Sequence, residues 1–231
     1  MREVIFDTET TGLDPKTGDR MVEIGCVEMI GRVETGRTFH AYFNPERDMP
    51  AEAERVHGLS AAFLATKPRF AEMADELLAF LGDAPLVAHN ANFDMGFLNA
   101  ELVLCGRAPI DMDRMIDTVA IARKKHPGAK LSLDALCTRY GIDRSHRVKH
   151  GALLDAELLA QVYIELTGGR QIGLELVDDI SPDTAGGTMA WHSPASNRPR
   201  RAPRPHAASP EELARHSAFI AAEIKEAIWT R

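Results

Sequence analysis

Apolar and polar residues alternate along the early part of the chain in the manner of strands. Val4, Ile5 and Phe6 form an apolar run that predicts a buried strand. Residues 20–29 and 35–43 alternate around further apolar positions and predict two more strands. Because consecutive strands with short links usually pair, we expect an antiparallel meander led by the first strand.

From Glu52 to Leu81 the apolar positions recur with a helical period. Short apolar runs at 85–88 and 115–117 then predict two further strands, each followed by a helical pattern. Two more helices are expected at 132–140 and 152–167. This order predicts an α/β protein with a mixed sheet and helices on both of its faces.

The predicted domain, residues 1–170, ends at the turn sequence Thr-Gly-Gly, and the composition then changes. A short peptide, 171–177, leads into residues 178–209, which are rich in Pro, Ser, Ala, Gly and Arg and predict a flexible, disordered linker. A helix is predicted for 210–231, because the sequence that opens it, Ser-Pro-Glu-Glu, fits a capping box. Its apolar stripe comprises Leu213, Ile220, Ile224 and Ile228.

Composition places the chain among globular proteins that can bury one good-sized core. It has 231 residues, of which 45% are hydrophobic and 26% are charged. No apolar run is long enough to span a bilayer and no signal peptide is visible, so we expect a cytoplasmic protein. The net charge of −7 argues against binding nucleic acid through a broad basic surface. The three cysteines, Cys26, Cys105 and Cys137, lack a metal-ligand spacing and are expected to be reduced.

Two carboxylates close the first predicted strand. Asp7 and Glu9 are two residues apart, so their side chains leave the strand on the same face. Two negative charges side by side repel each other unless a cation lies between them, and a hard divalent cation prefers oxygen ligands. The other reading is a strand end with solvated acids, and further acids downstream must decide between the two.

Further candidate ligands follow at two later positions. Asp94 falls at the start of a predicted helix, where an acid also suits helix capping. Asp155 lies in another predicted helix, with His150 five residues before it. Gly151 suggests that His150 precedes that helix on a loop, free to lie over a site floored by Asp155. The further acids Asp111, Asp113, Asp117 and Asp134 are read as helix caps or helix-start charges.

Three motifs in this order, D-x-E, H-N-x-x-F-D and H-x-x-x-x-D, resemble the DEDDh family of 3′→5′ exonucleases. His57-Gly58 and the run 132–136, Ser-Leu-Asp-Ala-Leu, are similar to its proofreading members in bacterial replication. The resemblance covers residues 1–170 and implies a ribonuclease H-like fold. It implies that Asp7, Glu9, Asp94 and Asp155 hold two Mg²⁺ or Mn²⁺ ions, with His150 as general base. It also places Glu52 and His57, together with Asp7, Glu9 and Asp155, near the terminal nucleotide.

The tail carries two candidate docking segments. The spacing of Gln171, Leu174 and Leu176 resembles the peptide by which bacterial replication proteins bind the sliding clamp. The resemblance further implies that the terminal helix attaches the nuclease to the catalytic subunit of a replicative DNA polymerase. The expected substrate is the single-stranded or frayed 3′ end of DNA. A stand-alone member of the family that acts on RNA or short oligonucleotides, and a non-catalytic docking subunit, are the alternatives.

Overall fold

The computed structural model describes residues 1–145, 147, 149–169 and 208–223. The chain divides into two units, Met1–Leu176 and Val177–Arg231. The predicted peptide at 171–177 and residues 178–207 of the predicted linker lie outside the described residues, so the expected boundary at 170 stays a prediction.

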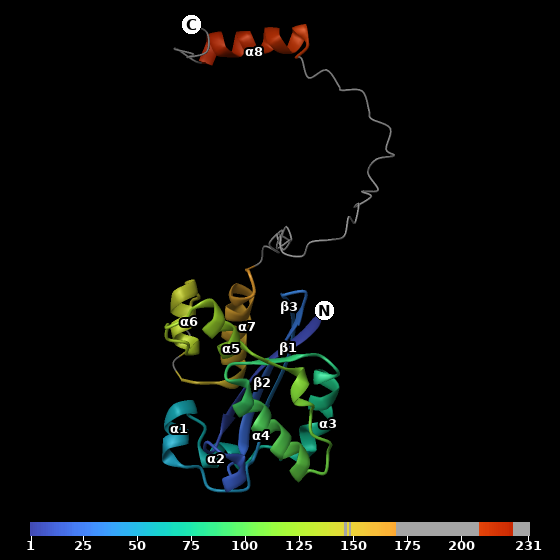
Figure 1. Ribbon diagram of the computed structural model, residues 1–231, viewed down its shortest axis with the longest axis vertical. Helices are drawn as coiled ribbons and strands as arrows, with labels where there is room; N and C mark the ends of the chain where they lie inside the picture. Colours follow the sequence, from blue (N-terminus) through green and yellow to red (C-terminus); the bar gives the residue numbers. More distant parts are fainter. Residues whose placement is uncertain (146, 148, 170–207, 224–231) are drawn as a thin grey trace, which may run out of the picture. The chain divides into compact units, whose positions relative to one another are not determined.

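A five-stranded mixed sheet forms the centre of the first unit (Figure 1). Its spatial order is β3-β2-β1-β4-β5. The first three strands pair antiparallel as the meander that the sequence predicted, and β4 and β5 extend it in parallel with β1. The strand bounds are Arg2–Thr10 for β1, Met21–Ile30 for β2, Val33–Tyr42 for β3, Leu86–Ala88 for β4 and Met115–Asp117 for β5.

Helices cover both faces of the sheet, as predicted. The stretch from Glu52 to Leu81 is divided into three helices, and Gly58, with φ of 80°, ends the first of them. The bounds are Ala51–His57 for α1, Ala61–Leu64 for α2, Phe70–Leu81 for α3, Ala91–Leu104 for α4, Thr118–Lys125 for α5, Leu133–Tyr140 for α6 and Ala152–Leu166 for α7. Two 3₁₀ turns, Pro15–Thr17 and Met112–Arg114, complete the unit.

Successive residues of β1 enter opposite cores. Val4 and Phe6 pack into a cluster with apolar residues of α3 and α4. Ile5, between them, packs into a second cluster with residues of α7. Both clusters consist of apolar side chains packed against one another. Cys26 and Cys137 are buried free thiols, as expected from the sequence. The alternation fixes which face of the sheet each later residue of β1 can reach.

Gly25 lets α7 approach the sheet at the point where Asp7 lies. Gly25 is the β2 partner of Asp7 in the antiparallel register. A Cβ atom at Gly25 would lie 2.2 Å from the backbone nitrogen of Leu153, in the first turn of α7. The missing side chain therefore allows direct contact between helix backbone and strand, which brings the start of α7 beside the end of β1.

The second unit contains α8, Pro210–Glu223. Its predicted capping box is present: the Ser209 amide donates to Glu212 Oε2 at 2.9 Å, and the Glu212 amide donates to Ser209 Oγ at 3.2 Å. Leu213 is 55% exposed and Phe219 60%. Ile224 and Ile228 lie outside the described residues. Within the described part of the chain, no helix has the length and apolarity needed to span a membrane.

We predict that Gly25→Ala destabilises the protein by about 1–3 kcal/mol, because the new methyl group must displace the α7 backbone. Gly96→Ala in α4 is the matched control, since a Cβ there meets no heavy atom within 4 Å and alanine favours a helix by about 0.5–1 kcal/mol. Urea unfolding measures both changes. Equal stability of the two variants would show that the α7 backbone does not depend on Gly25.

Candidate active site

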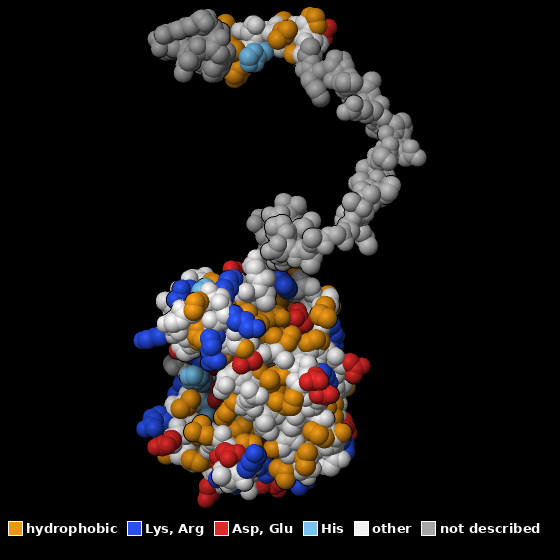
Figure 2. All heavy atoms as spheres, in the orientation of Figure 1, with side chains coloured by type: hydrophobic (Ala, Val, Ile, Leu, Met, Phe, Trp, Pro, Cys, Tyr) orange, Lys and Arg blue, Asp and Glu red, His pale blue; other side chains and the backbone are white. Residues whose placement is uncertain are grey.

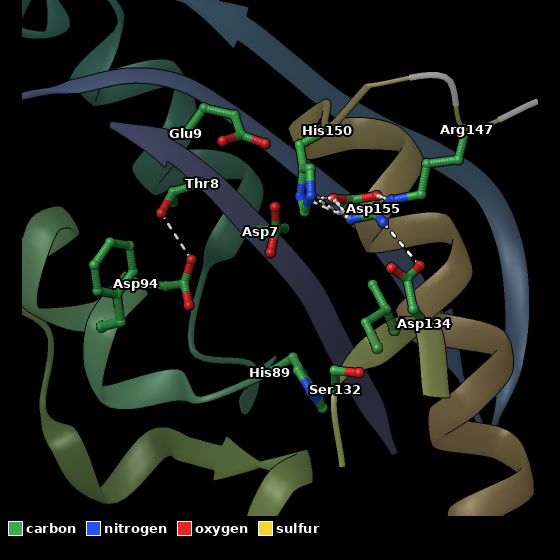
Figure 3. Close-up of a pocket in the computed structure, with 12 residues that line it drawn as sticks. Asp7, Thr8, Glu9, His89, Asp94, Ser132, Asp134, Arg147, His150 and Asp155 are labelled. Atoms are coloured by element: carbon green, nitrogen blue, oxygen red, sulfur yellow. Dashed lines mark hydrogen bonds and ion pairs between the residues drawn. The ribbon is translucent and has the colours of Figure 1, made fainter. Parts of the chain in front are cut away.

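The carboxyl ends of the parallel strands β1, β4 and β5 meet at one edge of the sheet, where a pocket of about 260 Å³ opens. Ligands of α/β sheets usually bind at such an edge. All four predicted acids, Asp7, Glu9, Asp94 and Asp155, line the pocket together with His150 (Figure 3). Figure 2 shows the surface hollowed between α1 and α6, with histidine atoms in the hollow. The structure therefore brings together side chains that are far apart in sequence.

Successive side chains of β1 point to opposite faces of the sheet, so the strand contacts acids on both faces. Thr8 points toward the α4 side, where its hydroxyl donates to Asp94 Oδ1 at 2.7 Å. Asp94 lies in the first turn of α4, and Asn90 begins that helix with a left-handed φ of 67°. Asp117 Oδ1 accepts from the amide of Asn90 at 3.1 Å and also caps α5 through Val119. The position of Asp94 is thus fixed by the hydrogen bond from Thr8 of β1 and by the one between Asn90 and Asp117.

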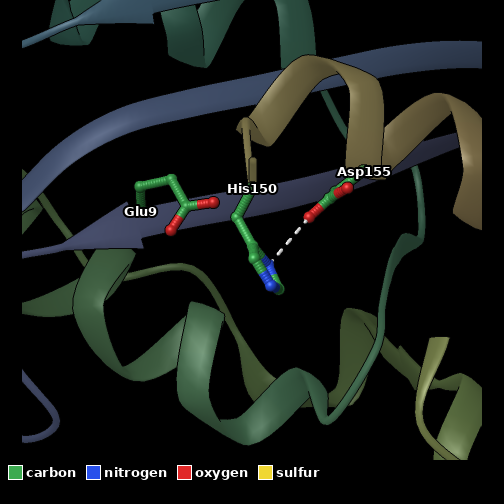
Figure 4. Close-up of side chains that lie close together, drawn as sticks. All are labelled: Glu9, His150 and Asp155. Carbon is green, nitrogen blue, oxygen red and sulfur yellow. Dashed lines mark ion pairs between the residues drawn. The ribbon is translucent and has the colours of Figure 1, made fainter. Parts of the chain in front are cut away.

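His150 precedes α7, as Gly151 suggested, because Gly151 occupies the N-cap position in an extended conformation. The His150 amide makes a long hydrogen bond of 3.4 Å to the carbonyl of Val56 in α1. Its side chain is 48% exposed, and Nδ1 lies 3.3 Å from Asp155 Oδ2. Ligand atoms of Glu9, His150 and Asp155 all lie within 4.8 Å of one another (Figure 4). The carboxylate oxygens of Glu9 and Asp155 suit a hard divalent cation.

Arg147 is a member of the site that the sequence did not predict. Its Nε donates to Asp155 Oδ1 at 2.5 Å, and its Nη2 donates to Asp155 Oδ2 at 2.7 Å. Its Nη1 reaches Asp134 Oδ1 at 2.9 Å. An arginine three residues before His150 carries no motif signal, because its position depends on how the loop between α6 and α7 folds. Asp134, read as a helix-start charge, does lie in the first turn of α6, but it also lines the pocket.

Arg147 also contacts the imidazole ring of His150. Its Nη2 lies 2.8 Å from Nδ1 and 3.5 Å from Nε2. The guanidinium group thus lies against the ring, and Asp155 and His150 share the same arginine.

Negative charges lie close together in this pocket. Burial, followed by the charges of Asp94 and Glu9, raises the pKa of Asp7 well above its ordinary value. Burial and the nearby Glu23 carboxylate raise the pKa of Glu9 to about 8. Burial also raises the pKa of Asp94 to about 7, opposed by the Thr8 hydrogen bond. Arg147 lowers the pKa of Asp7 and Glu9 but does not cancel the rise caused by burial and by the other acids. Divalent cations stabilise such a concentration of carboxylates. The residues present therefore fit the metal ions that the resemblance implies.

A second pocket, of about 620 Å³, adjoins the first and shares Thr8, Glu9 and Phe93 with it. Glu52 and His57, both from α1, line this second pocket. The amide of Leu59 donates to His57 Nδ1 at 3.0 Å, so His57 Nε2 carries a proton. Nε2 is buried and has no hydrogen-bond partner in the described structure, and burial lowers the pKa of the ring. Asp111 and Asp113 line neither pocket.

Comparison with known proteins identifies relatives over nearly the whole chain. A family model described as "Exonuclease" matches residues 4–163. The DNA polymerase III subunit epsilon of Rickettsia felis is 49% identical over 230 residues, covering 98% of this chain and 99% of that protein. The subunit of the same name from Escherichia coli is 47% identical over 176 residues, covering 73% and 72%.

Solved structures agree with the fold. Exonuclease X bound to duplex DNA with a 5′ overhang aligns at a TM-score of 0.55 and 26% identity, over 71% of this chain and 90% of that one. Escherichia coli Exonuclease I in complex with a dT13 oligonucleotide aligns at a TM-score of 0.64 over 72% of this chain and 41% of that one. At 16% identity the second match supports the fold alone.

The fold and its acidic pocket define a metal-dependent 3′→5′ exonuclease of the DEDDh class with a ribonuclease H-like fold. Within that class, the chain belongs to the family of the DNA polymerase III epsilon subunits. The class and family predicted from the three motifs are confirmed.

We predict that the metal-free protein loses stability as pH rises from about 4 to 8. Folding raises the pKa of Asp94 from 3.8 to about 7 and that of Glu9 from 4.5 to about 8, so the folded state binds more protons than the unfolded chain in this window. Stability then falls with increasing pH. Thermal unfolding in EDTA measures the effect, and excess Mg²⁺ should reverse the trend because the ion binds ionised carboxylates.

Asp7→Asn is the comparison variant for this pH series, because it removes the carboxylate that repels the other two. Its melting temperature in EDTA should depend less on pH than that of the unaltered protein. An unaltered protein that gains stability between pH 5 and 8 in EDTA would contradict the electrostatic description of the pocket.

Proposed function

We propose that this protein is the proofreading subunit of a bacterial replicative DNA polymerase and excises mispaired nucleotides from the 3′ end of the growing strand. The observation that carries the proposal is the convergence of four carboxylates and His150 on one pocket that continues into a second. The similarity to epsilon subunits over 98% of the chain supports the same role.

Asp7, Glu9, Asp94 and Asp155 are the residues that would hold two divalent cations, Mg²⁺ or Mn²⁺. Such ions supply a nucleophilic water at neutral pH and stabilise the charge on the leaving 3′ oxygen. Asp7 is central among the four acids, because the charges of the other three all raise its pKa. We therefore assign Asp7 as the ligand shared by both ions.

His150 is assigned as the general base. It lies at the start of α7, beside Asp155, with an imidazole ring that is half exposed to the pocket. A neutral imidazole accepts a proton from water near neutral pH more readily than a carboxylate of ordinary pKa does. The link from its amide to Val56 joins the base to α1, which carries the residues of the second pocket.

The second pocket is proposed to hold the terminal nucleotide. The buried Nε2–H of His57 makes no hydrogen bond of normal geometry among the described residues, although the Thr10 backbone is close enough to raise the pKa of the ring against burial. A poorly paired buried donor is costly unless a ligand supplies the partner. Glu52 is exposed at the same wall, and we assign it as the acceptor of a hydrogen bond from the 3′ hydroxyl group. A strand must leave its duplex to enter these pockets, so a mismatch lowers the cost of unpairing and favours excision.

The tail is proposed to carry the contacts with the replication machinery. Helix α8 presents Leu213 and Phe219 to solvent and packs on nothing within the second unit as described. We infer that its apolar stripe, with Ile220, Ile224 and Ile228, docks on the polymerase catalytic subunit. Gln171, Leu174 and Leu176 are the proposed clamp-binding residues, and these contacts would place the protein in the cytoplasm.

We predict that Asp7→Asn abolishes exonuclease activity, whereas His150→Gln lowers it by about 10²–10⁴-fold, because a lost base leaves the metal ligands in place. The assay follows nucleotide release from 3′-labelled DNA with a paired or a mispaired end, and the mispaired end should react faster. Closed circular DNA is the negative control, and a matched RNA strand tests the RNA-trimming alternative. Activity that persists in excess EDTA, or a faster reaction on RNA, would contradict the proposal.

We predict that deletion of residues 178–231 abolishes association with the replicative polymerase and leaves hydrolysis of free oligonucleotides unchanged, because both pockets lie in the first unit. Pull-down with the purified catalytic subunit measures the first effect. A matched variant, Leu213→Glu in the full chain, should weaken association without shortening the tail. If the deleted protein still binds the polymerase, the attachment lies in the nuclease unit.

A further inference from the structure

Arg147 is the positive charge of the acidic pocket. It is the one Lys or Arg among the described residues that line this pocket. Its side chain is only 9% exposed, and that of its partner Asp155 only 3%. The guanidinium group contacts Asp155, Asp134 and His150 at the same time. An arginine this buried, with three such partners, lies inside the pocket and not at its edge.

Arg147 engages both carboxylate oxygens of Asp155. Nε and Nη2 take one carboxylate oxygen each, in the bidentate arrangement that makes arginine–carboxylate pairs strong. Nη2 also lies against the His150 ring, 2.8 Å from Nδ1 and 3.5 Å from Nε2. Asp155 is one of the proposed metal ligands and His150 is the proposed base, so a single side chain covers two of the groups that the reaction uses.

We propose that Arg147 is an internal counter-ion that holds Asp155 in the metal-free protein and is exchanged for a divalent cation when the site loads. The inference rests on the proposed metal site and adds a competitor to it. Binding of the ion at Asp155 displaces Arg147 from that carboxylate, and the same movement takes the guanidinium group away from the imidazole ring of His150. Arg147 and the ion therefore compete for Asp155.

Two features of the fold favour the exchange of Arg147 for a cation at Asp155. Arg147 belongs to the connection between α6 and α7 and lies in neither helix. Asp134 remains as a second partner, since its Oδ1 already accepts from Nη1 of Arg147 at 2.9 Å. The charge of Arg147 also acts on the neighbouring acids, lowering the pKa of Asp7 and Glu9 against the effect of burial. Without this arginine, the metal-free pocket would hold its acids with no cation.

Arg144 provides a matched control. It lies in the same connection and binds the same Asp134 oxygen, at 2.8 Å, but its described contacts do not include Asp155 or His150. Arg144→Gln therefore removes one positive charge near the pocket and leaves the proposed competitor in place. Arg147→Lys keeps the charge but loses the paired hydrogen bonds to Asp155.

The test is calorimetric titration of Mn²⁺ into the full-length protein without DNA. We expect Arg147→Gln to bind Mn²⁺ about tenfold more tightly than the unaltered protein, because the cation no longer displaces two charge-assisted hydrogen bonds. Arg147→Lys should fall between them, and Arg144→Gln should change the affinity by less than about twofold. In EDTA, Arg147→Gln should melt at a lower temperature, and Mn²⁺ should raise its melting temperature by more than that of the unaltered protein.

Equal or weaker Mn²⁺ affinity of Arg147→Gln, or an equal gain in Arg144→Gln, would overturn the role of Arg147 while leaving the metal site intact. If Arg147→Gln does not fold in EDTA, Arg147→Lys decides the matter by the same criterion of tighter binding. If the unaltered protein binds no Mn²⁺ and degrades DNA in EDTA, the proposed metal site itself fails.

Discussion

Mutual repulsion among Asp7, Glu9, Asp94 and Asp155 is the constraint on which the rest of the structure depends. A pocket that concentrates negative charge favours divalent cations, and the same concentration opposes folding before the cations arrive. Three features of the surrounding structure offset this repulsion. Two apolar cores fix the end of β1, Thr8 donates to Asp94, and Arg147 supplies a positive charge at Asp155.

The pleat of a single strand explains how acids from opposite faces of the sheet reach one point. Asp7 and Glu9 leave β1 toward α7, where Gly25 allows the helix backbone to lie close enough to present Asp155. Thr8 leaves on the other face and holds Asp94 at the start of α4. The active site is therefore a property of the strand end and of the two helices that begin there.

The two units of the chain divide the work of the proposed proofreading subunit. The first unit holds both pockets. Helix α1 links the two pockets, because the Val56 carbonyl accepts from the His150 amide and His57 lines the second pocket. The second unit presents an amphipathic helix with exposed apolar residues and a complete capping box. Tethering a nuclease to its polymerase raises its effective concentration at the primer end without requiring one fixed orientation.

The sequence by itself determined the order of the strands, the fold class and the family, because period, capping and motif spacing are local properties of the chain. It also singled out the four acids and His150, which meet in one pocket and whose roles stay predictions. It also indicated that His150 precedes α7, since Gly151 marks the beginning of the helix. Only the tertiary structure decided that Arg147 lies in the pocket, that Thr8 holds Asp94 and that Nε2 of His57 is left without a partner. These features arise from contacts between residues distant in sequence or from the path of a loop, and no repeating pattern along the chain records such contacts.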